Sequence, residues 1–575
     1  MITRAYTPHT PTWQRFHEYA APLLSSSGAG SAADAVATAG HHPYSRQYSH
    51  VYSARLAMLR GRCIDNAQQC LKDDEGIGDE EKGSVNVADK IIEVKEGVWS
   101  ILVGTIVKEM DAKRRPAVES KYTDAADAQS FLFPKDGDEK KEQESLRSYL
   151  FDSEKGDVLH LEDESGRVEL AAEVGTGADA MDVDDANTKS NALDPNKVAT
   201  GVVAAVLGKI CATKGIMHVH SIHFAGPPPS DNTSTNAELL RGPTNDGETT
   251  TDENEPILLL VSGLNCGSDS PTDTESGASL ALRREMLLEY LTDPTLSNGA
   301  SVCRVIVAGG GVSAPTIKEE ESSKNTKKKN YNTIAKSQNI KNSKDNTAHT
   351  AFALRELDLY LSEFLASGLP VDYVPGMHDP TNANWPQRPL HSCLLPLSCG
   401  FVDLFGSGTN PYEGVLGDEK SGGLRVLGSD GLNIADLRRF LTNKDAGEDD
   451  GEGENKDDKV SSSSCIDALN ATLNYGHMAP TGPDSLPTFP SSESDPFVLK
   501  SRPSVYFVGN CDEFETRLVD ANGDKIADGS CDVSKDGNIV TRLVCVPSFA
   551  LTGEVVLVKL KSLECEIVSF NDASL

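Results

Sequence analysis

The sequence predicts two folded units in one chain, a small β-barrel followed by a layered α/β domain. The barrel is predicted by several short strands with glycine kinks between residues 97 and 225. The α/β domain is predicted by near-continuous apolar runs after residue 256, which alternate with helical segments. Strands of that kind are buried on both faces and are covered by helices. A chain of 575 residues is long enough for both units.

The chain is strongly acidic, with a formal net charge of −33. A protein that binds nucleic acid through its overall field is basic, so this charge argues against that class. Much of the acidity lies in runs such as ADAMDVDDANT and DAGEDDGEGENKDDK. These runs have little apolar area to bury, so we expect them to be solvated inserts.

Targeting and redox features place the chain in the cytosol or nucleus. The N-terminal stretch MITRAYTPHTPTWQRF lacks the apolar segment of a signal peptide. No run of about eighteen apolar residues is present, so no membrane span is expected. The 12 Cys are scattered without a C-x-x-C pair, which argues against a disulfide framework and a cysteine-rich zinc module.

The first folded unit is expected to begin with a helix. Residues 1–42 are rich in Ser, Ala and Gly, and we expect a disordered tail there. After them, apolar side chains recur at spacings of three and four residues, which predicts a helix. Its apolar face is expected to consist of Tyr48, Val51, Tyr52, Leu56 and Leu59.

The barrel strands follow this helix. Residues 97–110 predict a strand that bends at Gly104, and residues 156–170 predict a hairpin around an acidic turn. Residues 198–225 predict two or three further strands. Short strands with glycine kinks are typical of a closed barrel of the OB type. We place this helix-and-barrel domain, with its acidic inserts, at residues 43–231, and an acidic linker at residues 232–256.

The second domain is expected at residues 257–575. Its predicted strands are PILLLVSGL, VCRVIVAGG, PVDYVPG, GLRVLGSDG, SVYFVGN and TRLVCVPSF. Helices are predicted at residues 277–293 and 347–367, and inserts near residues 315–348 and 443–463. In layered α/β folds the functional groups lie at the carboxyl ends of the strands, so those ends are the place to test for a site.

The order of these strand ends resembles that of the calcineurin-like metallophosphoesterases. In that superfamily the strand ends carry D-x-H, G-D-x-x-D, G-N-H-[DE], a lone His and G-H-x-H, which bind two metal ions that activate water and hold a phosphate. Here the corresponding positions are degenerate: Ser262, Leu264, Gly310, Met377, Asn510 and Asp512. The remnants of the pattern are His378, Asp379 and His477.

The degenerate pattern predicts an inactive site. The bridging carboxylate is missing at Gly310, and the thioether of Met377 is a poor ligand for hard divalent ions. We therefore expect no catalytic residues, no metal and no cofactor. His378 and Asp379 are expected to serve turn geometry and packing.

An OB-type barrel followed by an inactive phosphoesterase domain resembles the B-subunits of the eukaryotic replicative DNA polymerases. The segments that carry the resemblance include YSRQYSHVYSARL, VPGMHDPTNANWPQRPLHSCLLP and VYFVGNCDEF, and they match the regulatory subunits of delta type best. The resemblance implies a nuclear, non-catalytic scaffold for replication and repair synthesis. It would bridge the cysteine-rich C-terminal module of the catalytic subunit and a third accessory subunit, with an indirect link to the sliding clamp and DNA.

Three alternatives stay open at this point. The chain resembles the alpha and epsilon B-subunits more weakly, and family pattern alone separates them. An active phosphoesterase or nuclease would need an unusual ligand set from His378, Asp379, His477 and Asp512. An independent nucleic-acid-binding barrel would need exposed aromatic and basic side chains, whereas Trp99 lies in an apolar strand and is expected in the core.

Two further segments are candidates for contacts. The proline-rich stretch after Asp379 holds residue types that anchor interfaces, although a packed connecting loop explains it equally well. The candidate interface residues are Trp385, Arg388, Leu394 and Leu395. The basic stretch Ser322–Lys344 is favoured as a solvated insert, with a nuclear-import signal or a DNA-facing loop as alternatives.

Overall fold

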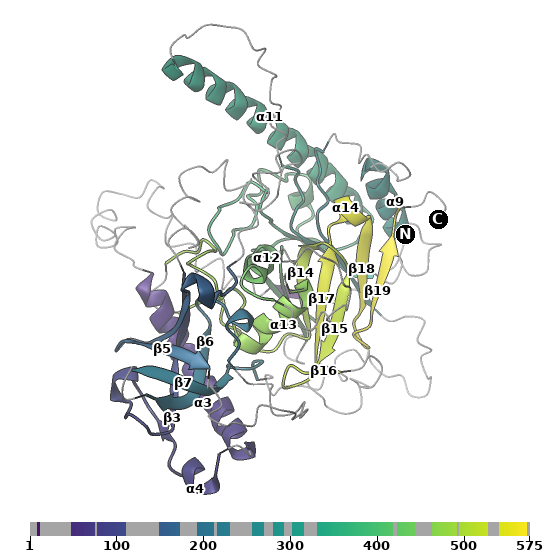
Figure 1. Cartoon of the computed structure of the whole chain (residues 1–575). Helices are drawn as coiled ribbons and strands as arrows, with labels where there is room; N and C mark the ends of the chain where they lie inside the picture. The colour runs from purple at the N-terminus through teal and green to yellow at the C-terminus, as the bar shows by residue number, and fades with distance from the viewer. Residues whose placement is uncertain are drawn as a thin grey trace, which may run out of the picture.

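In the computed structural model, the described residues form three β-sheets and the helices that cover them (Figure 1). One sheet closes into a barrel in the N-terminal part of the chain, and the other two belong to the larger α/β part. This mixed architecture agrees with the two units predicted from the sequence. The structure describes residues 9–11, 48–74, 77–110, 149–172, 193–211, 215–229, 256–268, 280–292, 302–314, 331–417, 423–442, 463–490, 494–526 and 540–571.

The barrel closes because its last strand in the sheet order pairs back with a strand near the other edge. Its strands follow the order β2-β3-β4-β5-β7-β6, and β3 also pairs with β6. They are β2 (Asn86–Val87), β3 (Ser100–Glu109), β4 (Val158–Glu162), β5 (Arg167–Ala172), β6 (Val203–Ile210) and β7 (Ile216–His223). A Cβ at Gly104 would lie 2.6 Å from the carbonyl oxygen of Glu162, so glycine is what allows β3 and β4 to approach. The predicted hairpin is confirmed as β4 and β5.

Helix α3 (Ser49–Asp73) covers the outside of the barrel, and the short α4 (Asp79–Lys82) follows it (Figure 1). Side chains of α3 such as Leu59 and Cys63 pack against Ile101 of β3 and its neighbours. The predicted helix is therefore confirmed, but its face differs in two places. Tyr48 is 40% exposed, and the charged Arg55 is buried.

The other two sheets stack on each other. The six-stranded sheet has the order β11-β10-β9-β8-β18-β19, and the seven-stranded sheet has the order β1-β12-β13-β14-β17-β15-β16. The first consists of β8 (Ile257–Val261), β9 (Val302–Ala308), β10 (Val371–Val374), β11 (Phe405–Ser407), β18 (Glu554–Lys559) and β19 (Cys565–Ser569). The second consists of β1 (His9–Pro11), β12 (Tyr412–Leu416), β13 (Leu424–Ser429), β14 (Val505–Cys511), β15 (Glu515–Val519), β16 (Lys525–Ile526) and β17 (Thr541–Pro547). All six apolar runs predicted as strands are confirmed.

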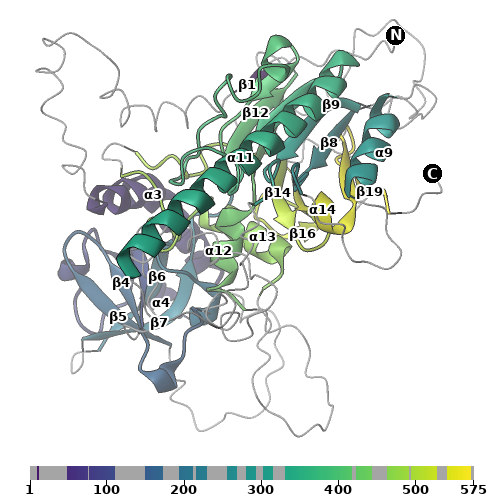
Figure 2. The ribbon, with the colours of Figure 1, turned by 90° about the horizontal axis from the view of Figure 1, so that it is seen from above.

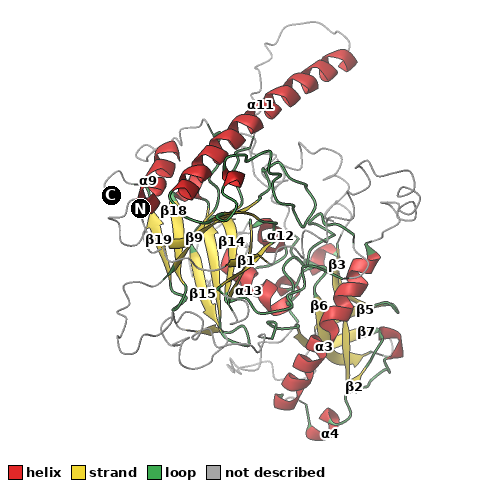
Figure 3. Cartoon of the chain, turned by 180° about the vertical axis from the view of Figure 1, so that it is seen from behind, coloured by secondary structure: helices red, strands yellow, loops and turns green. Residues whose placement is uncertain are grey.

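Helices cover the outer faces of both sheets, as Figure 3 shows for α9 and α11 on one side and α12 and α13 on the other. The helices are α9 (Leu280–Thr292), α11 (Tyr331–Ala366), α12 (Leu432–Arg438), α13 (Cys465–Tyr475) and α14 (Phe549–Thr552). Both helices predicted early in this domain are present as α9 and α11.

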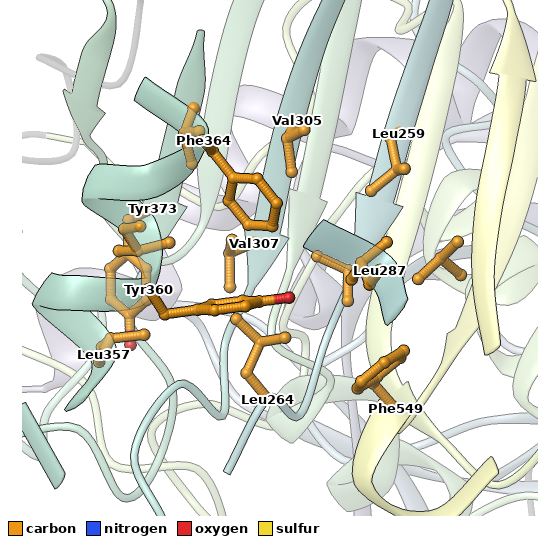
Figure 4. Close-up of a cluster of buried hydrophobic side chains, with 14 of the residues drawn as sticks. Leu259, Leu264, Leu287, Val305, Val307, Leu357, Tyr360, Phe364, Tyr373 and Phe549 are labelled. Atoms are coloured by element: carbon orange, nitrogen blue, oxygen red, sulfur yellow. The ribbon is translucent and has the colours of Figure 1, made fainter. Parts of the chain in front are cut away.

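Alternation along the strands explains the layers. Successive side chains of a strand point to opposite faces, so a strand buried on both faces joins two cores. In β8, Leu259 faces α9 and α11, where it belongs to the same cluster as Phe364 (Figure 4). Its neighbour Leu260 belongs to the core between the two sheets. In β14, Phe507 lies in the core between the sheets, while Tyr506 faces α12 and α13.

Two segments predicted as a tail and as an insert contain regular secondary structure. Residues 9–11 form β1, which pairs antiparallel with β12, because the edge of the seven-stranded sheet offers unpaired backbone groups to an extended segment. The part of the insert predicted near residues 315–348 that the structure describes, from residue 331 onwards, lies in α11. Figures 1 and 2 show α11 as one long helix.

The acidic linker, apart from residue 256, and residues 443–462 of the second insert lie outside the described residues. The domain boundaries therefore stay predictions. Trp99 is half-buried, so the expectation that it lies in the core is met only in part. It packs against the core between α3 and the barrel, while its indole N–H donates to Glu81 and the Lys209 ammonium lies 4.2 Å from its ring centre.

Candidate functional site

The carboxyl ends of β8 and β14 meet at one edge of the stacked sheets, where the sequence places the degenerate ligand positions. Ser262 follows β8 and is fully buried. Its hydroxyl donates to the carbonyl oxygen of Pro547 at 2.9 Å and accepts from the amide of Asn510 at 2.9 Å. Ser262 therefore ties the ends of β8, β14 and β17 together.

Backbone atoms fill the space between these strand ends. A Cβ at Gly310 would lie 2.9 Å from the Cα of Gly263 and 2.9 Å from Oδ1 of Asn510. A Cβ at Gly376 would lie 2.5 Å from the amide nitrogen of Gly310. Gly310 also has a φ of 67°, which a side chain strains. An aspartate at position 310, where the resemblance to the metallophosphoesterases would place a bridging carboxylate, does not fit this packing.

Asp379 holds the turn that follows β10. Its carboxylate accepts hydrogen bonds from the amides of Gly376 at 2.6 Å and Val312 at 3.1 Å. The side chain is only 4% exposed, and this burial raises its pKa to about 6 in spite of the two amides. Its donors come from the β9 and β10 loops, so Asp379 fastens one loop to the other.

The two residues that precede Asp379 occupy less buried positions than the carboxylate. Met377 and His378 are both half-buried. Burial lowers the pKa of His378, which favours its neutral form. The expectation that His378 and Asp379 serve the turn stays a prediction, and the contacts of Asp379 support it.

A second buried carboxylate, Asp430, is not among the residues that the sequence singles out. It follows β13, accepts from Nδ2 of Asn410 at 2.7 Å, and its own carbonyl oxygen accepts from Nδ2 of Asn510 at 2.8 Å. Asn410 also donates to Oε1 of Gln387 at 2.8 Å. Burial raises the pKa of Asp430 to about 6. A polar S-D-G at a strand end is a signal for this network, but its partners lie in distant segments.

Arg55 forms a buried junction between the barrel helix and the larger domain. Its Nε lies 2.8 Å from Oδ2 of Asp495. Its other nitrogens donate to the carbonyl oxygens of Gly201 at 2.9 Å, Pro480 at 2.8 Å and Gly482 at 2.7 Å. One guanidinium thus joins α3, a barrel loop and the loop after α13. Sequence reasoning missed this role, because the pattern around Arg55 indicates only an apolar helix face.

His477 belongs to this junction. Its Nε2 lies 3.0 Å from Oδ2 of Asp495, and its Nδ1 accepts from the amide of Ala479. Burial and the neighbouring Arg55 lower the pKa of His477 to about 4, so the ring is neutral near pH 7. Burial alone would raise the pKa of Asp495, but His477 and Arg55 hold it below its usual value.

A glycine and a lysine complete the contact between the two units. A Cβ at Gly201 would lie 2.0 Å from the carbonyl oxygen of Pro480, so the barrel loop touches the larger domain backbone to backbone. Lys108 of β3 is 6% exposed and donates to the carbonyl oxygen of Phe440 at 3.1 Å. Its burial lowers its pKa to about 7.

The structure does not assemble the alternative ligand set. Asp512 has a side chain that is 81% exposed and pairs with Arg438, while His477 is buried against Asp495. Leu264 is a core residue beside α9 and α11. Within the described ranges, no group of three or more His, Cys, Asp or Glu side chains is arranged to hold a metal ion.

The expected interface residues fall into two groups. Trp385 and Leu395 are 0% and 1% exposed, which supports the alternative of a packed connecting loop at these two positions. Trp385 packs with Phe497 in the core under α12 and α13, because the proline-rich loop folds back onto the loop after α13. Arg388 and Leu394 are half-buried, and their role stays a prediction.

None of the helices in the described part of the chain is long and apolar enough to cross a bilayer.

Comparison with known proteins follows the same division into two units. Residues 47–222 match the family model of the OB-fold domain of the DNA polymerase delta subunit, and residues 258–516 match the family model of the B-subunit of DNA polymerases alpha and epsilon. The DNA polymerase delta small subunit of Arabidopsis thaliana is 28% identical over 531 residues, which is 92% of this chain and 91% of the relative. DNA polymerase delta subunit 2 of Drosophila melanogaster is 29% identical over 92% of this chain and 94% of its own. The chain is thus similar along nearly its whole length to the DNA polymerase delta small subunits, and its two units match family models of DNA polymerase B-subunits.

Proposed function

We propose that this chain is the non-catalytic small subunit of a nuclear DNA polymerase delta, in which it acts as a rigid scaffold during replication and repair synthesis. The assignment to delta rather than to alpha or epsilon is supported by relatives that cover about nine-tenths of both chains. The single observation that carries the scaffold role is the buried junction at Arg55, which fixes the barrel against the larger domain.

The non-catalytic part of the proposal is supported by the closed strand ends. Gly263, Gly310 and Gly376 touch backbone to backbone where a phosphoesterase would hold its metals. The carboxylate of Asp379 is used by two amides. We infer that the second domain is an inactive calcineurin-like domain whose strand ends now serve packing.

The partners are a further part of the proposal. A scaffold with two joined units offers surfaces to two different proteins at a fixed separation. We propose the cysteine-rich C-terminal module of the polymerase catalytic subunit as one partner and a third accessory subunit as the other. The sliding clamp and DNA would then be reached through these partners.

The test is a co-purification from nuclear extract with the tagged full chain as bait. We expect a large polymerase with a cysteine-rich C-terminus and a smaller accessory subunit, identified by mass spectrometry. Metal analysis of the recombinant chain should find no stoichiometric divalent ion, and a phosphodiester assay should find no hydrolysis. A chain that purifies alone with two metal ions and cleaves a phosphodiester would overturn the proposal.

A further inference from the structure

A cavity of about 430 Å³ lies where the barrel meets the larger domain. Three distant segments form its wall: the first turns of α3, the end of β3 with the β4–β5 turn, and the loop at Asp484. Cavities at such boundaries between units are common places for binding. This cavity lies beside the Arg55 junction, so its shape is held by buried contacts.

The wall combines apolar surface with negative charge. Leu56, Val107 and the ring of Tyr52 supply the apolar part. Glu162 and Asp484 lie on the same cavity, as do Asp163 and Glu164 at the β4–β5 turn.

The neighbouring cations Arg55 and Arg167 balance this negative charge only in part. Arg55 uses its donors on Asp495 and three carbonyl oxygens. Arg167 lies 3.9 Å from Glu162 but is 58% exposed and also pairs with Glu109. The charge of Asp163 is instead stabilised by hydrogen bonds, because amides and the Ser165 hydroxyl donate to its carboxylate.

One hydrogen bond holds a carboxylate of the cavity wall in position to accept from a hydrogen-bond donor of a ligand. The hydroxyl of Tyr52 donates to Oδ2 of Asp484 at 2.7 Å. This bond fixes the carboxylate of Asp484 against α3. The ring of Tyr52 lies 5.5 Å from the Arg55 guanidinium carbon, so it already borders one cation.

The chemistry of the wall selects one class of occupant. Phosphate groups of nucleic acid are repelled by carboxylates, which argues against DNA or RNA. The described carboxylates are not grouped to hold a metal ion. An arginine side chain fits both parts of the wall, because its stem covers apolar surface and its planar head binds carboxylates and stacks on aromatic rings.

We propose that this cavity receives an arginine side chain from a basic segment of a partner polypeptide. The inference rests on the proposed function, since the partner is taken to be another subunit of the polymerase. The head group binds between Glu162 and Asp484, and the stem lies against Tyr52 and Leu56. The acidic surface at the barrel boundary would then bind one arginine of the partner specifically.

The experiment compares two double variants of the full chain in assembly with the catalytic subunit. Glu162→Gln with Asp484→Asn removes two charges from the cavity, and the Asn still accepts from Tyr52. Asp512→Asn with Glu513→Gln removes two exposed charges elsewhere. We expect the cavity variant to bind at least about tenfold more weakly and the control to bind like the wild type. Thermal unfolding of both variants checks that they fold.

A second measurement leaves the carboxylates Glu162 and Asp484 intact. A photo-crosslinking residue at Glu164, on the rim, should capture a partner peptide that contains arginine, read by mass spectrometry. The inference would be overturned, while the assembly itself stands, by equal binding of both double variants or by capture of DNA. Capture of this chain's own basic stretch KRR at residues 113–115 would overturn it as well. Failure of the wild-type chain to assemble would instead overturn the proposed function.

Discussion

Arg55 Nε and Asp495 Oδ2 lie 2.8 Å apart, and neither side chain is more than 1% exposed. The two residues are 440 positions apart in the sequence. Their ion pair joins the first helix of the barrel to a loop of the larger domain. A charge pair in such a place makes the relative position of the two units depend on a few buried hydrogen bonds.

Breaking this pair should be costly. For Arg55→Met we expect a loss of about 3–5 kcal/mol in the free energy of unfolding, because Asp495 is left buried without its cation. Urea denaturation of the full chain measures the loss. The control is Asp512→Asn, which breaks a pair with an 81% exposed carboxylate and should cost about 0–1 kcal/mol. Similar small effects of both changes would show that the junction is not a stabilising element.

His477 should make the junction sensitive to acid. Its pKa is lowered to about 4 in the folded chain, against 6.5 for an ordinary histidine. Between these values the unfolded chain binds the extra proton, so stability falls as the pH drops from 6.5 towards 4. The wild type should lose unfolding free energy between pH 6.5 and pH 5, and we expect His477→Gln to remove about 1–2 kcal/mol of that loss. Urea denaturation at several pH values measures this difference. An equal pH dependence of stability in the wild type and in His477→Gln would contradict the assignment.

Asp379 and Asp430 should act in the opposite direction. Their pKa values are raised to about 6, against 3.8 for an ordinary aspartate. Between these values the folded chain binds more protons, so stability that is present at low pH is lost as the pH rises towards 6. Asp379→Asn should flatten this part of the stability profile. An unchanged slope between pH 4 and 6 would rule out a titrating Asp379.

The closed strand ends should reject even a methyl group. Gly376→Ala places a Cβ 2.5 Å from the amide nitrogen of Gly310, and we expect a loss of about 1–3 kcal/mol. Gly61→Ala is the matched control, because it lies in α3 with no atom within 4 Å of its Cβ. That change should stabilise the chain by about 0.5–1 kcal/mol. A neutral Gly376→Ala would mean that the strand ends have room for a ligand.

Trp385 should behave as a core residue. Because its side chain is fully buried, Trp385→Ala should cost about 3–5 kcal/mol in unfolding free energy. Partner affinity, measured where the variant is still folded, should change little. A variant with wild-type stability and lost partner binding would instead restore Trp385 as an interface residue.

The sequence by itself determined the elements and their class. Apolar runs such as ILLLV at 257–261 and VYFVGNC at 505–511 are buried on both faces. A strand with no polar face must lie inside a sheet that is covered on both sides, as in a layered α/β fold. The degenerate ligand positions were also visible, because a Gly at 310 and a Met at 377 cannot be carboxylate or amide ligands whatever the fold.

Only the tertiary structure decided which residues meet. Arg55, His477 and Asp495 lie in two distant segments, and no local pattern couples a helical arginine to a loop carboxylate. Asp430 and Asn410 likewise find each other through strand order. Trp385 looked like an anchor because its residue type is common at interfaces, yet the fold buries it. Local spacing sets secondary structure, whereas burial and pairing of polar groups depend on contacts between distant segments, which one sequence does not reveal.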